Sequence, residues 1–515
     1  MRLDDHGLVV RTDGPTIPGG PQHCGAVLDR ARADAPEAEA LVGRSGRCTY
    51  AELDAMAGRA VGALGALGVR PGDRVACTMT NDTDIVIAFL GAMRVGAIWV
   101  GINTALAPAE QDYLVRDCDA RVHLGRTVPL IEWRDRCAVS EVTPVSVEIA
   151  SHSPAAIAYT SGTTGFPKGA VHSHHNLLLV GAATRLVGTY DPTFRHGVCL
   201  PLTILNLMVL GPLTTFQLGG CVVTMDRTDP VGMAESIGRE RIATFSAVPA
   251  IMHDLLTHPD VRADQLVSLV RPGVGGADLP EAFRTMYRER FGTEVTIGYG
   301  LTEAPTAVTM TDPQAPPIPG EAGCALPQIE IVIVDDDDVP LAPGEVGEVC
   351  VTAASIGELA RVYTPMLGYW HQPDATRAAL RGGILHTADL GFLDTDGHLF
   401  IKDRRGDVIL RGGANVYPAE VERVLHADPR VAECAVVGYP DERLGERVAA
   451  FVRVSSPVTP EELAVHCATE LARYKVPDRY ELVDELPRTP MGKIRKRELA
   501  ERLRGARHRP ASRPG

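Results

Sequence analysis

The chain has 515 residues, too many for one ordinary domain and enough for several packed cores. Its formal net charge of −14 argues against non-specific nucleic-acid binding, although a nucleotide pocket needs only local positive charge. The 11 cysteines are scattered, with no C-x-x-C pair and no spacing typical of a zinc site or disulfide framework, so we expect a cytoplasmic, reducing setting.

The N-terminal part alternates between helix and strand patterns. Residues 1–24 are rich in Gly, Pro and Asp and predict a loose arm, and acidic residues stand where an export signal would be basic. Thr49 and Glu52 have capping-box spacing. Such alternation predicts βαβ units and a parallel sheet, and residues 116–148 are interpreted as an irregular link. We expect helices over 26–35, 49–67 and 84–95 and strands over 75–80 and 97–102.

A buried strand predicted over residues 155–159 runs into YTSGTTGFPKGA, at residues 159–170. Glycines let the backbone come close to a ligand, and the backbone N–H groups and hydroxyls of this loop can donate hydrogen bonds to an anion. Lys168 adds a mobile positive charge at the end of the loop. A Walker-type loop is excluded because Gly169 stands where Ser or Thr would bind magnesium, and a plain turn is the other alternative. The predicted phosphate-binding residues are Thr160, Ser161, Gly162, Thr163, Thr164, Gly165 and Lys168.

Two stretches after this loop allow alternative interpretations. His172, His174 and His175 suggest a metal site, but no partner group of Cys or His stands nearby, so we favour an ordinary loop-to-helix junction. Residues 197–225 carry no charge and are long enough to span a bilayer. Proline, glycine and polar residues interrupt them, so we expect a buried helix and strand and no membrane span.

Glycine-rich and aromatic signatures follow, after helices expected over 231–240 and 249–256 and a strand over 242–247. The turn at 273–280 lets the backbone lie flat against a planar ring, and a helix follows it through residue 291. In IGYGLTE, residues 297–303, Tyr299 can stack on adenine and Thr302 can hydrogen-bond a phosphate oxygen. Glu303 can hold a magnesium ion, which prefers oxygen ligands.

The last third has strand and helix patterns of its own. Four aspartates end a strand predicted over 331–339; they lack calcium-loop spacing and predict an exposed hairpin tip. A further strand is expected over 344–351, and 394–397 predicts a tight turn. Towards the C-terminus we expect strands over 408–410, 431–438 and 447–454 and helices over 418–426 and 460–471, with a disordered tail after 505.

Taken together, these motifs resemble those of the adenylate-forming superfamily, which comprises acyl-CoA synthetases, peptide-synthetase adenylation domains and luciferases. The resemblance runs from about Thr49 to Leu499 and includes YGLTE, HTADLGF at 386–392, KDRRGD at 402–407, RGGANVYP at 411–418 and PRTPMGKIR at 487–495. It implies an α/β fold. Residues 1–404 would form a large N-terminal domain of stacked parallel or mixed sheets with helices and a small β-structure, and residues 405–515 a small mobile α+β domain.

The resemblance also implies roles for single residues. Asp389 matches the family's aspartate that binds both ribose hydroxyls, and a carboxylate suits this task because it accepts two hydrogen bonds at once. Arg404 matches the family's arginine that contacts the ribose and phosphate side. Lys493 matches the mobile catalytic lysine and acts with Thr302 and Glu303. Gly406 stands at the hinge, where relatives usually carry Asp or Lys. The remaining predicted nucleotide contacts are Gly276, Ala277, Asp278, Gly298, Tyr299 and Gly300, and Gly412 and Gly413 match the loop that lines the pantetheine tunnel.

The acid pocket departs from the pattern of many relatives. Thr203 and Ile204 stand where these have a Phe-His pair, and Ile297 where many acyl-CoA ligases have a glutamine near the nucleotide. The smaller side chains predict room for a bulky, largely apolar or aryl acid, as in secondary metabolism. The predicted pocket residues are Thr203, Ile204, Asn206, Val248, Gly275, Gly276, Gly300 and Ala304.

The implied activity is ATP- and Mg²⁺-dependent formation of acyl-AMP from a small-molecule carboxylic acid, followed by transfer to coenzyme A. One alternative is a ligase that passes the acyl group to a separate carrier-protein thiol or an amine. A non-catalytic nucleotide-binding regulator is the other, against which the intact Lys168, Glu303 and Lys493 count. We expect no nucleic-acid partner, and a homodimer stays open.

Overall fold

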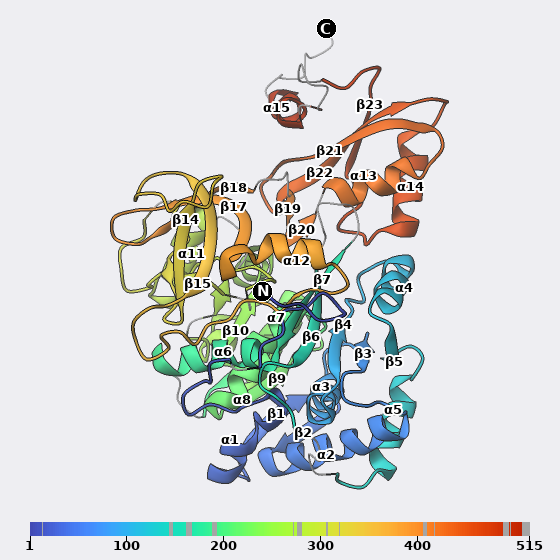
Figure 1. Ribbon diagram of the computed structural model, residues 1–515. Helices are drawn as coiled ribbons and strands as arrows, with labels where there is room; N and C mark the ends of the chain where they lie inside the picture. Colours follow the sequence, from blue (N-terminus) through green and yellow to red (C-terminus); the bar gives the residue numbers. More distant parts are fainter. Residues whose placement is uncertain are drawn as a thin grey trace. The chain divides into compact units, whose positions relative to one another are not determined.

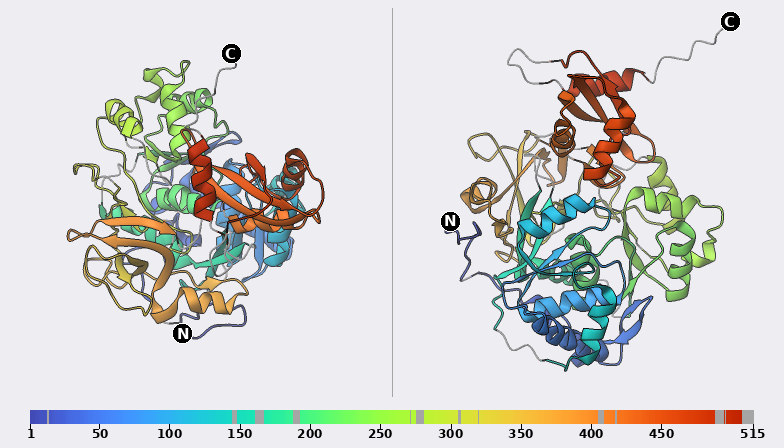
Figure 2. Two further views of the ribbon diagram at one scale, coloured as in Figure 1. Left: turned by 90° about the horizontal axis from the view of Figure 1, so that it is seen from above. Right: turned by 90° about the vertical axis from the view of Figure 1, so that its right-hand side faces the viewer.

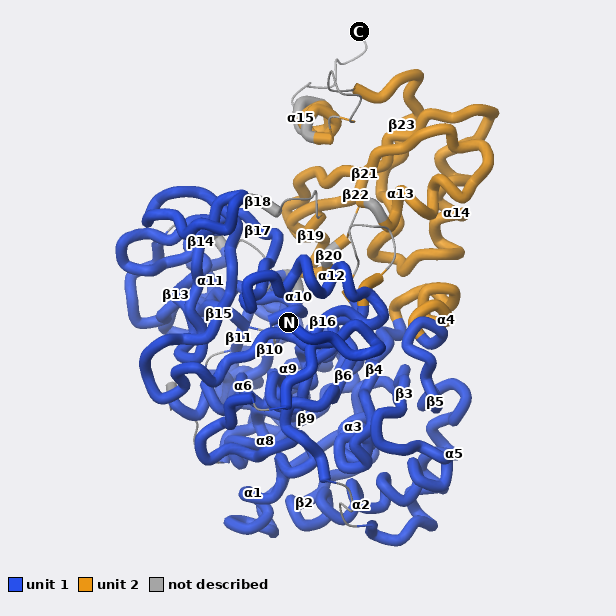
Figure 3. Tube along the Cα trace, viewed as in Figure 1, with its two compact units in different colours: residues 1–104, 115–159, 169–403 blue, residues 105–114, 160–168, 404–515 orange. Residues whose placement is uncertain are grey.

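The computed structural model divides into two compact units (Figure 3). The first comprises residues 1–104, 115–159 and 169–403, and the second residues 105–114, 160–168 and 404–515. The structure describes residues 1–12, 14–143, 148–160, 167–187, 193–270, 272–274, 281–304, 307–318, 320–404, 409–416, 418–487, 494 and 496–506. The predicted α/β class, with a smaller C-terminal part, is confirmed.

Two six-stranded sheets dominate the first unit (Figure 1). One has the order β16 (Gly368–Tyr369), β7 (Lys168–Ser173), β6 (Pro154–Thr160), β4 (Ile98–Gly101), β3 (Arg74–Cys77) and β5 (Ala120–Leu124). The other has the order β11 (Gly273–Val274), β10 (Thr244–Ala247), β8 (Arg195–Val198), β9 (Cys221–Thr224), β1 (Glu39–Gly43) and β2 (Gly46–Thr49). Strands β6, β4, β3 and β5 pair in parallel, as do β11, β10, β8, β9 and β1, which confirms the predicted parallel pairing.

A third, antiparallel sheet follows later in the chain, and its strands are β14 (Ile329–Val334), β15 (Gly347–Ala353), β17 (Leu385–Leu393) and β18 (Leu399–Arg404). A two-stranded ribbon, β12 (Thr309–Met310) and β13 (Cys324–Ala325), accompanies it. Strand β14 ends at Val334, earlier than predicted, and Asp335 begins the turn that contains the other aspartates. The turn predicted at 394–397 is confirmed by the bond from Gly397 N to Asp394 O.

Helices cover these sheets because their apolar faces join the cores. The capping box at Thr49 and Glu52 is present at the start of α2, and α2 lies beside α3 (Figure 2). Trp99 of β4 packs edge-on against Phe89 of α3, with the ring centroids 5.5 Å apart. The helices before residue 403 are α1 (Asp29–Asp34), α2 (Tyr50–Ala66), α3 (Thr83–Val95), α4 (Pro108–Asp117), α5 (Leu130–Val139), α6 (His174–Val187), α7 (Leu205–Met208), α8 (Thr214–Leu218), α9 (Pro230–Glu240), α10 (Pro249–Thr257), α11 (Glu281–Phe291) and α12 (Pro373–Ala379).

The C-terminal part of the second unit is an antiparallel sheet with helices. Its strands are β19 (Ile409–Arg411), β20 (Ala414–Val416), β21 (Val431–Asp441), β22 (Gly445–Val454) and β23 (Arg479–Leu482), of which β23 pairs with β22 in parallel. Its helices are α13 (Pro418–His426), α14 (Pro460–Glu470) and α15 (Lys496–Ala506). Here α13 has the predicted bounds, whereas β20, β23 and α15 were not predicted.

Two expectations were wrong. The N-terminal arm is not loose: Leu8 and Ile17 are buried, and Val9 N bonds to Leu367 O. Residues 116–148 are also more regular than predicted, since α5 lies among them.

The uncharged stretch at residues 197–225 forms three consecutive helical pieces before β9. The middle piece is a π-helix over Val209–Leu213 that contains Pro212. In the described part of the chain, no helix is both long and apolar enough for a membrane span.

Candidate nucleotide and acid site

Tyr299 and Asp389, which belong to different signatures, meet in the first unit. The Tyr299 hydroxyl donates to Asp389 Oδ2 at 2.6 Å, across 90 residues of sequence. Asp389 lies in β17 and is 1% exposed, so water cannot replace the tyrosine as a donor. Its backbone N–H donates to Thr387 Oγ1 at 3.1 Å, which holds the backbone of Asp389 within the strand. A short contact of this kind fixes the direction of a buried carboxylate.

The backbone around Tyr299 is fixed by its neighbours on β12. Tyr299 N donates to Thr309 Oγ1 at 3.1 Å, and Val308 N donates to Tyr299 O at 2.9 Å. At Gly298 a Cβ atom would lie 2.8 Å from Thr309 O, closer than real Cβ atoms approach. The glycine that precedes Tyr299 is therefore required by close packing against β12.

Glu303 is half-buried and has a partner that the sequence did not indicate. The Tyr369 hydroxyl donates to Glu303 Oε1 at 2.8 Å, and Met366 N donates to Glu303 O at 3.3 Å. Within the described part of the chain Glu303 Oε2 accepts no hydrogen bond, so this oxygen can act as a ligand. An oriented carboxylate that can offer an oxygen fits a magnesium ion.

The loop that contains Thr302 and Glu303 rests on a buried histidine. His172, on β7, hydrogen-bonds to the backbone of Thr302, and burial lowers the pKa of its ring to about 4. His174 Nδ1 accepts from Cys24 N at 3.3 Å, and His175 Nε2 pairs with Val362 O at 2.7 Å. Each of the three histidines thus has its own backbone partner, as in the structural junction that we favoured over a metal site.

The predicted acid pocket lies at the carboxyl ends of adjacent parallel strands. Thr203 and Ile204 follow β8, and Val248 follows β10, which pairs with β8 in parallel. Open α/β sheets bind ligands at this edge. Thr203 and Ala304 are buried, Ile204 is 39% exposed, Val248 and Asn206 are half-buried, and Gly300 is exposed.

The two large sheets meet at this edge. A Cβ atom on Gly101, the last residue of β4, would lie 2.1 Å from Thr203 O. Asn81 also holds this loop: its Nδ2 donates to Leu200 O at 2.8 Å, and its Oδ1 accepts from Leu202 N at 2.8 Å. Sequence reasoning did not single out Asn81 or Tyr369. For Asn81 the only available signal was its position four residues after the end of β3. For Tyr369 it was the sequence Gly-Tyr-Trp at residues 368–370, which is typical of a turn.

The phosphate loop is described only at its ends, where Thr160 closes β6 and Lys168 opens β7. Arg404 ends β18. In the second unit Gly412 and Gly413 have φ of 57° and 81°, in the left-handed region that favours glycine. The predicted residues that lie outside the described part of the chain are Ser161, Gly162, Thr163, Thr164, Gly165, Gly275, Gly276, Ala277, Asp278, Gly406 and Lys493.

Comparison with known proteins defines the class. The AMP-binding enzyme family matches residues 28–364, and the AMP-binding enzyme C-terminal domain matches residues 420–493. The chain therefore belongs to the AMP-binding, adenylate-forming family and is an AMP-forming acid–thiol ligase of the acyl-CoA synthetase branch.

Individual relatives cover nearly the whole chain. Long-chain-fatty-acid–CoA ligase FadD13 of Mycobacterium tuberculosis is 34% identical over 480 residues, which span 88% of this chain and 93% of the relative. Fatty acid–[acyl-carrier-protein] ligase ScoC of Streptomyces coeruleorubidus is 33% identical over 503 residues, which span 91% and 94%.

Two solved structures are similar throughout. The o-succinylbenzoate CoA synthetase MenE of Bacillus subtilis, a double mutant with a bound product analogue, has a TM-score of 0.82 at 29% identity, with 92% of this chain and 97% of that chain covered. The amide bond synthetase McbA of Marinactinospora thermotolerans has a TM-score of 0.79 at 30% identity, with 93% and 99% covered. These neighbours match both acceptor classes predicted for the chain.

Proposed function

We propose that this ligase activates a bulky, largely apolar or aryl acid with ATP and transfers it to coenzyme A in the cytoplasm. The observation that carries the nucleotide assignment is the 2.6 Å bond between Tyr299 and Asp389. This bond joins the Tyr299 ring, predicted to stack on adenine, to the Asp389 carboxylate, predicted to bind the ribose. Adenine and ribose are neighbours in a nucleoside, so their predicted partners should be neighbours in the protein. The unpaired state of all 11 cysteines supports a reducing compartment.

In the first step the acid carboxylate attacks the α-phosphate of ATP, pyrophosphate leaves, and acyl-AMP forms. Two anions must approach each other, so catalysis depends on positioning and on neutralising charge. Thr160 and Lys168 flank the loop that would hold the β- and γ-phosphates, and Thr302 would donate to a phosphate oxygen. Lys493 would bridge the attacking carboxylate and the α-phosphate.

Glu303 is the proposed magnesium ligand, and a bound magnesium ion would supply positive charge opposite the departing pyrophosphate. The contribution of the protein is to hold the carboxylate still. Tyr369 does so through its hydroxyl, and the bond from Met366 N fixes the backbone of Glu303. A preoriented ligand loses less conformational freedom when the ion binds.

In the second step the acceptor attacks the acyl carbon and AMP leaves. We propose that the domain boundary near Gly406 turns, that Lys493 withdraws, and that Gly412 and Gly413 line the path of the pantetheine thiol. The left-handed φ of both glycines supports a turn that residues with a Cβ atom rarely adopt. Arg404 would contact the ribose and phosphate side.

The acid class is tested by pyrophosphate release across a panel of acids from acetate to aryl and long-chain acids. We expect the highest kcat/KM for bulky acids, because apolar burial contributes about 25 cal/mol for each Å². Ile204→Phe should penalise bulky acids and spare small ones, whereas Val267→Phe, at another exposed apolar position, should leave the ranking unchanged. A preference for acetate would contradict the size assignment.

A second acceptor class is supported by the likeness to ScoC and to the amide bond synthetase McbA. The same activated acid would then be offered coenzyme A, a pantetheinylated carrier protein and a set of amines in parallel. Acyl transfer fastest to the carrier or to an amine, with coenzyme A inert, would replace the coenzyme A assignment and leave the adenylation step intact.

A further inference from the structure

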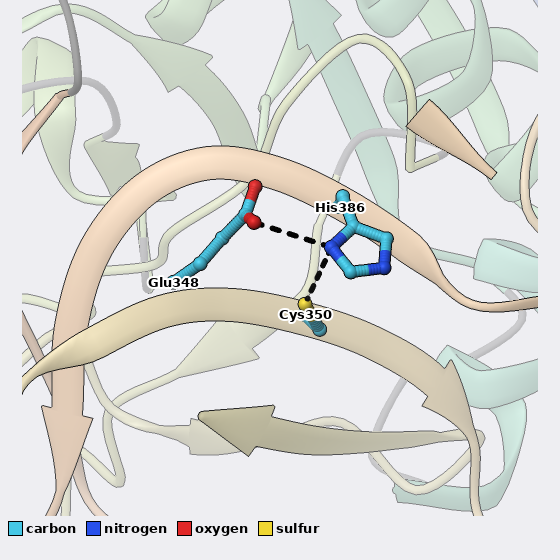
Figure 4. Close-up of side chains that lie close together, drawn as sticks. All are labelled: Glu348, Cys350 and His386. Atoms are coloured by element: carbon cyan, nitrogen blue, oxygen red, sulfur yellow. Dashed lines mark hydrogen bonds and ion pairs between the residues drawn. The ribbon is translucent and has the colours of Figure 1, made fainter. Parts of the chain in front are cut away.

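A cluster of metal-ligating side chains lies in the antiparallel sheet of the first unit, outside the residues assigned to the reaction. Glu348 and Cys350 project from β15 and His386 from β17, and all three are buried (Figure 4). His386 Nδ1 lies 3.2 Å from Cys350 Sγ and 3.2 Å from Glu348 Oε2. One carboxylate oxygen, one thiol sulfur and one imidazole nitrogen thus lie within 4.8 Å of one another.

One proton on His386 Nδ1 cannot serve both of its contacts. A neutral imidazole nitrogen carries either a proton or a lone pair, so Nδ1 can donate to Glu348 or accept from Cys350 but cannot do both. The other ring nitrogen, Nε2, is buried and has no hydrogen-bond partner in the described part of the chain. A cation in place of the shared proton would accept electron pairs from all three groups at once.

The distances fit a tetrahedral zinc-class site. Zinc binds sulfur at about 2.3 Å and nitrogen or oxygen at about 2.0–2.2 Å, so neighbouring ligand atoms stand roughly 3.3–3.5 Å apart. The two observed separations are 3.2 Å each. Asp338 Oδ1, 3.9 Å from His386 Nδ1, is a fourth donor within reach of a small side-chain movement.

Arg381 now occupies the open side of this cluster. Its Nη2 lies 2.8 Å from Asp338 Oδ1 and 2.9 Å from Glu348 Oε2. The side chains of Arg381 and Asp338 are 39% and 41% exposed, so the guanidinium can move into solvent and admit an ion, and Asp338 can turn towards it. The guanidinium bridges the same two carboxylates that an incoming cation would use.

We propose that Glu348, Cys350 and His386, with Asp338 as fourth donor, form a binding site for a soft divalent cation of the zinc class, and that Arg381 occupies its mouth until the ion enters. Thiolate and imidazole ligands select zinc-like ions over magnesium or calcium. On binding, the Cys350 thiol loses its proton to solvent and a metal–sulfur bond forms. The thiolate and two carboxylates carry three negative charges, of which the ion balances two, and the displaced Arg381 guanidinium moves to solvent.

The ion also has a route to the reaction, which rests on the proposed function. Glu348 Oε1 accepts from Ala388 N at 2.9 Å, and Ala388 has a left-handed φ of 60° immediately before Asp389. Such a conformation in a non-glycine residue persists only when its surroundings hold it. A cation that draws the Glu348 carboxylate away from Ala388 therefore weakens the support of Asp389, and zinc raises the KM for ATP.

The site is tested by titrating Co²⁺ into the reduced, chelator-treated full-length protein and following the thiolate-to-cobalt charge-transfer band. We expect one equivalent of bound Co²⁺ that Zn²⁺ displaces. Cys350→Ser should lose the band and bind at least about tenfold more weakly. The control, Cys324→Ser, removes an exposed cysteine of β13 and should keep the band.

Arg381→Met provides a test in the opposite direction, because removing a competing cation should tighten binding at least about tenfold. A band that persists in Cys350→Ser, or its absence from both the wild type and Arg381→Met, overturns the site. Zinc bound at one equivalent with an unchanged KM for ATP in the wild type overturns the coupling alone. If the zinc-free wild type released no pyrophosphate from ATP with any acid, the proposed function would fail, whatever the Co²⁺ titration showed.

Discussion

The assignment of Asp389 to the ribose can be tested by changing the enzyme and the nucleotide together. Asp389→Asn keeps the size of the side chain and an oxygen that can accept from Tyr299, but it removes the charge and one acceptor. The second change is 2′-deoxy-ATP, which lacks one of the two hydroxyls that the carboxylate would accept. The two changes should be strongly non-additive if the groups touch.

The magnitude follows from the burial of this carboxylate. A hydrogen bond to a charged group contributes about 1.5–3 kcal/mol, and at 1% exposure water cannot substitute for it. At roughly 1.4 kcal/mol per tenfold, the wild type should prefer ATP over deoxy-ATP by roughly ten- to hundredfold in kcat/KM. In Asp389→Asn that preference should fall to a few-fold.

The assay is acid-dependent pyrophosphate release with each nucleotide. Asp117→Asn is a matched control, because Asp117 Oδ2 accepts from the Tyr159 hydroxyl at the same distance of 2.6 Å but has no predicted contact with the ribose. The control should keep the full preference for ATP. An equal preference in the wild type and Asp389→Asn would refute the ribose assignment.

The remaining predictions concern the supports of the site. Tyr369→Phe should raise the Mg²⁺ concentration for half-maximal pyrophosphate release several-fold, because Glu303 loses its donor; an unmoved Mg²⁺ curve would contradict this. Asn81→Ala should destabilise the fold by about 1–3 kcal/mol and raise the KM for the acid, with the KM for ATP unchanged. Because burial lowers the pKa of His172 to about 4, its neutral form stabilises the fold above the unfolded value of 6.5. As the pH falls from 6.5 to about 4, the free energy of unfolding measured in urea should decrease by up to about 1.4 kcal/mol per pH unit. The decrease should be less steep in His172→Asn.

Local signals predicted those parts of the fold that local physics determines. The capping box at Thr49 begins a helix because the two side chains satisfy backbone N–H groups within the same turn. Helix α13 has its predicted bounds, since its apolar residues recur at helical spacing after a proline. Parallel pairing followed from the strand–helix alternation.

Other features depend on long-range packing that composition does not report. Gly and Pro in the N-terminal arm indicate the absence of regular structure, yet Leu8 and Ile17 are buried. Helix α5 buries only Trp133, so its apolar periodicity is weak; it is supported instead by the Glu132–Arg136 pair. Weak apolar periodicity therefore hides such a helix, and the i,i+4 charge pair is its only clear local signal among those considered.

The candidate site, too, was predicted from the sequence only in part. Motif matching assigned Tyr299 a stacking role, but only the fold shows that its hydroxyl also orients Asp389. Likewise Glu303 was predicted as a ligand, whereas its partner Tyr369 lies 66 residues away and comes into place through β16. Partners that meet across different sheets leave no periodic trace in the sequence.

The proposed site assigns the acid and the nucleotide to different structural elements. The residues expected around the acid follow β8 and β10, whereas Tyr299 and Asp389 are fixed by β12 and β17. Close backbone contact between Gly101 and Thr203 locks the base of the acid loop, so its size can be tuned mainly through side chains such as Ile204. If these assignments hold, substitutions at Ile204 would change which acid fits without moving Tyr299 and Asp389, so that one scaffold would serve acids of different size.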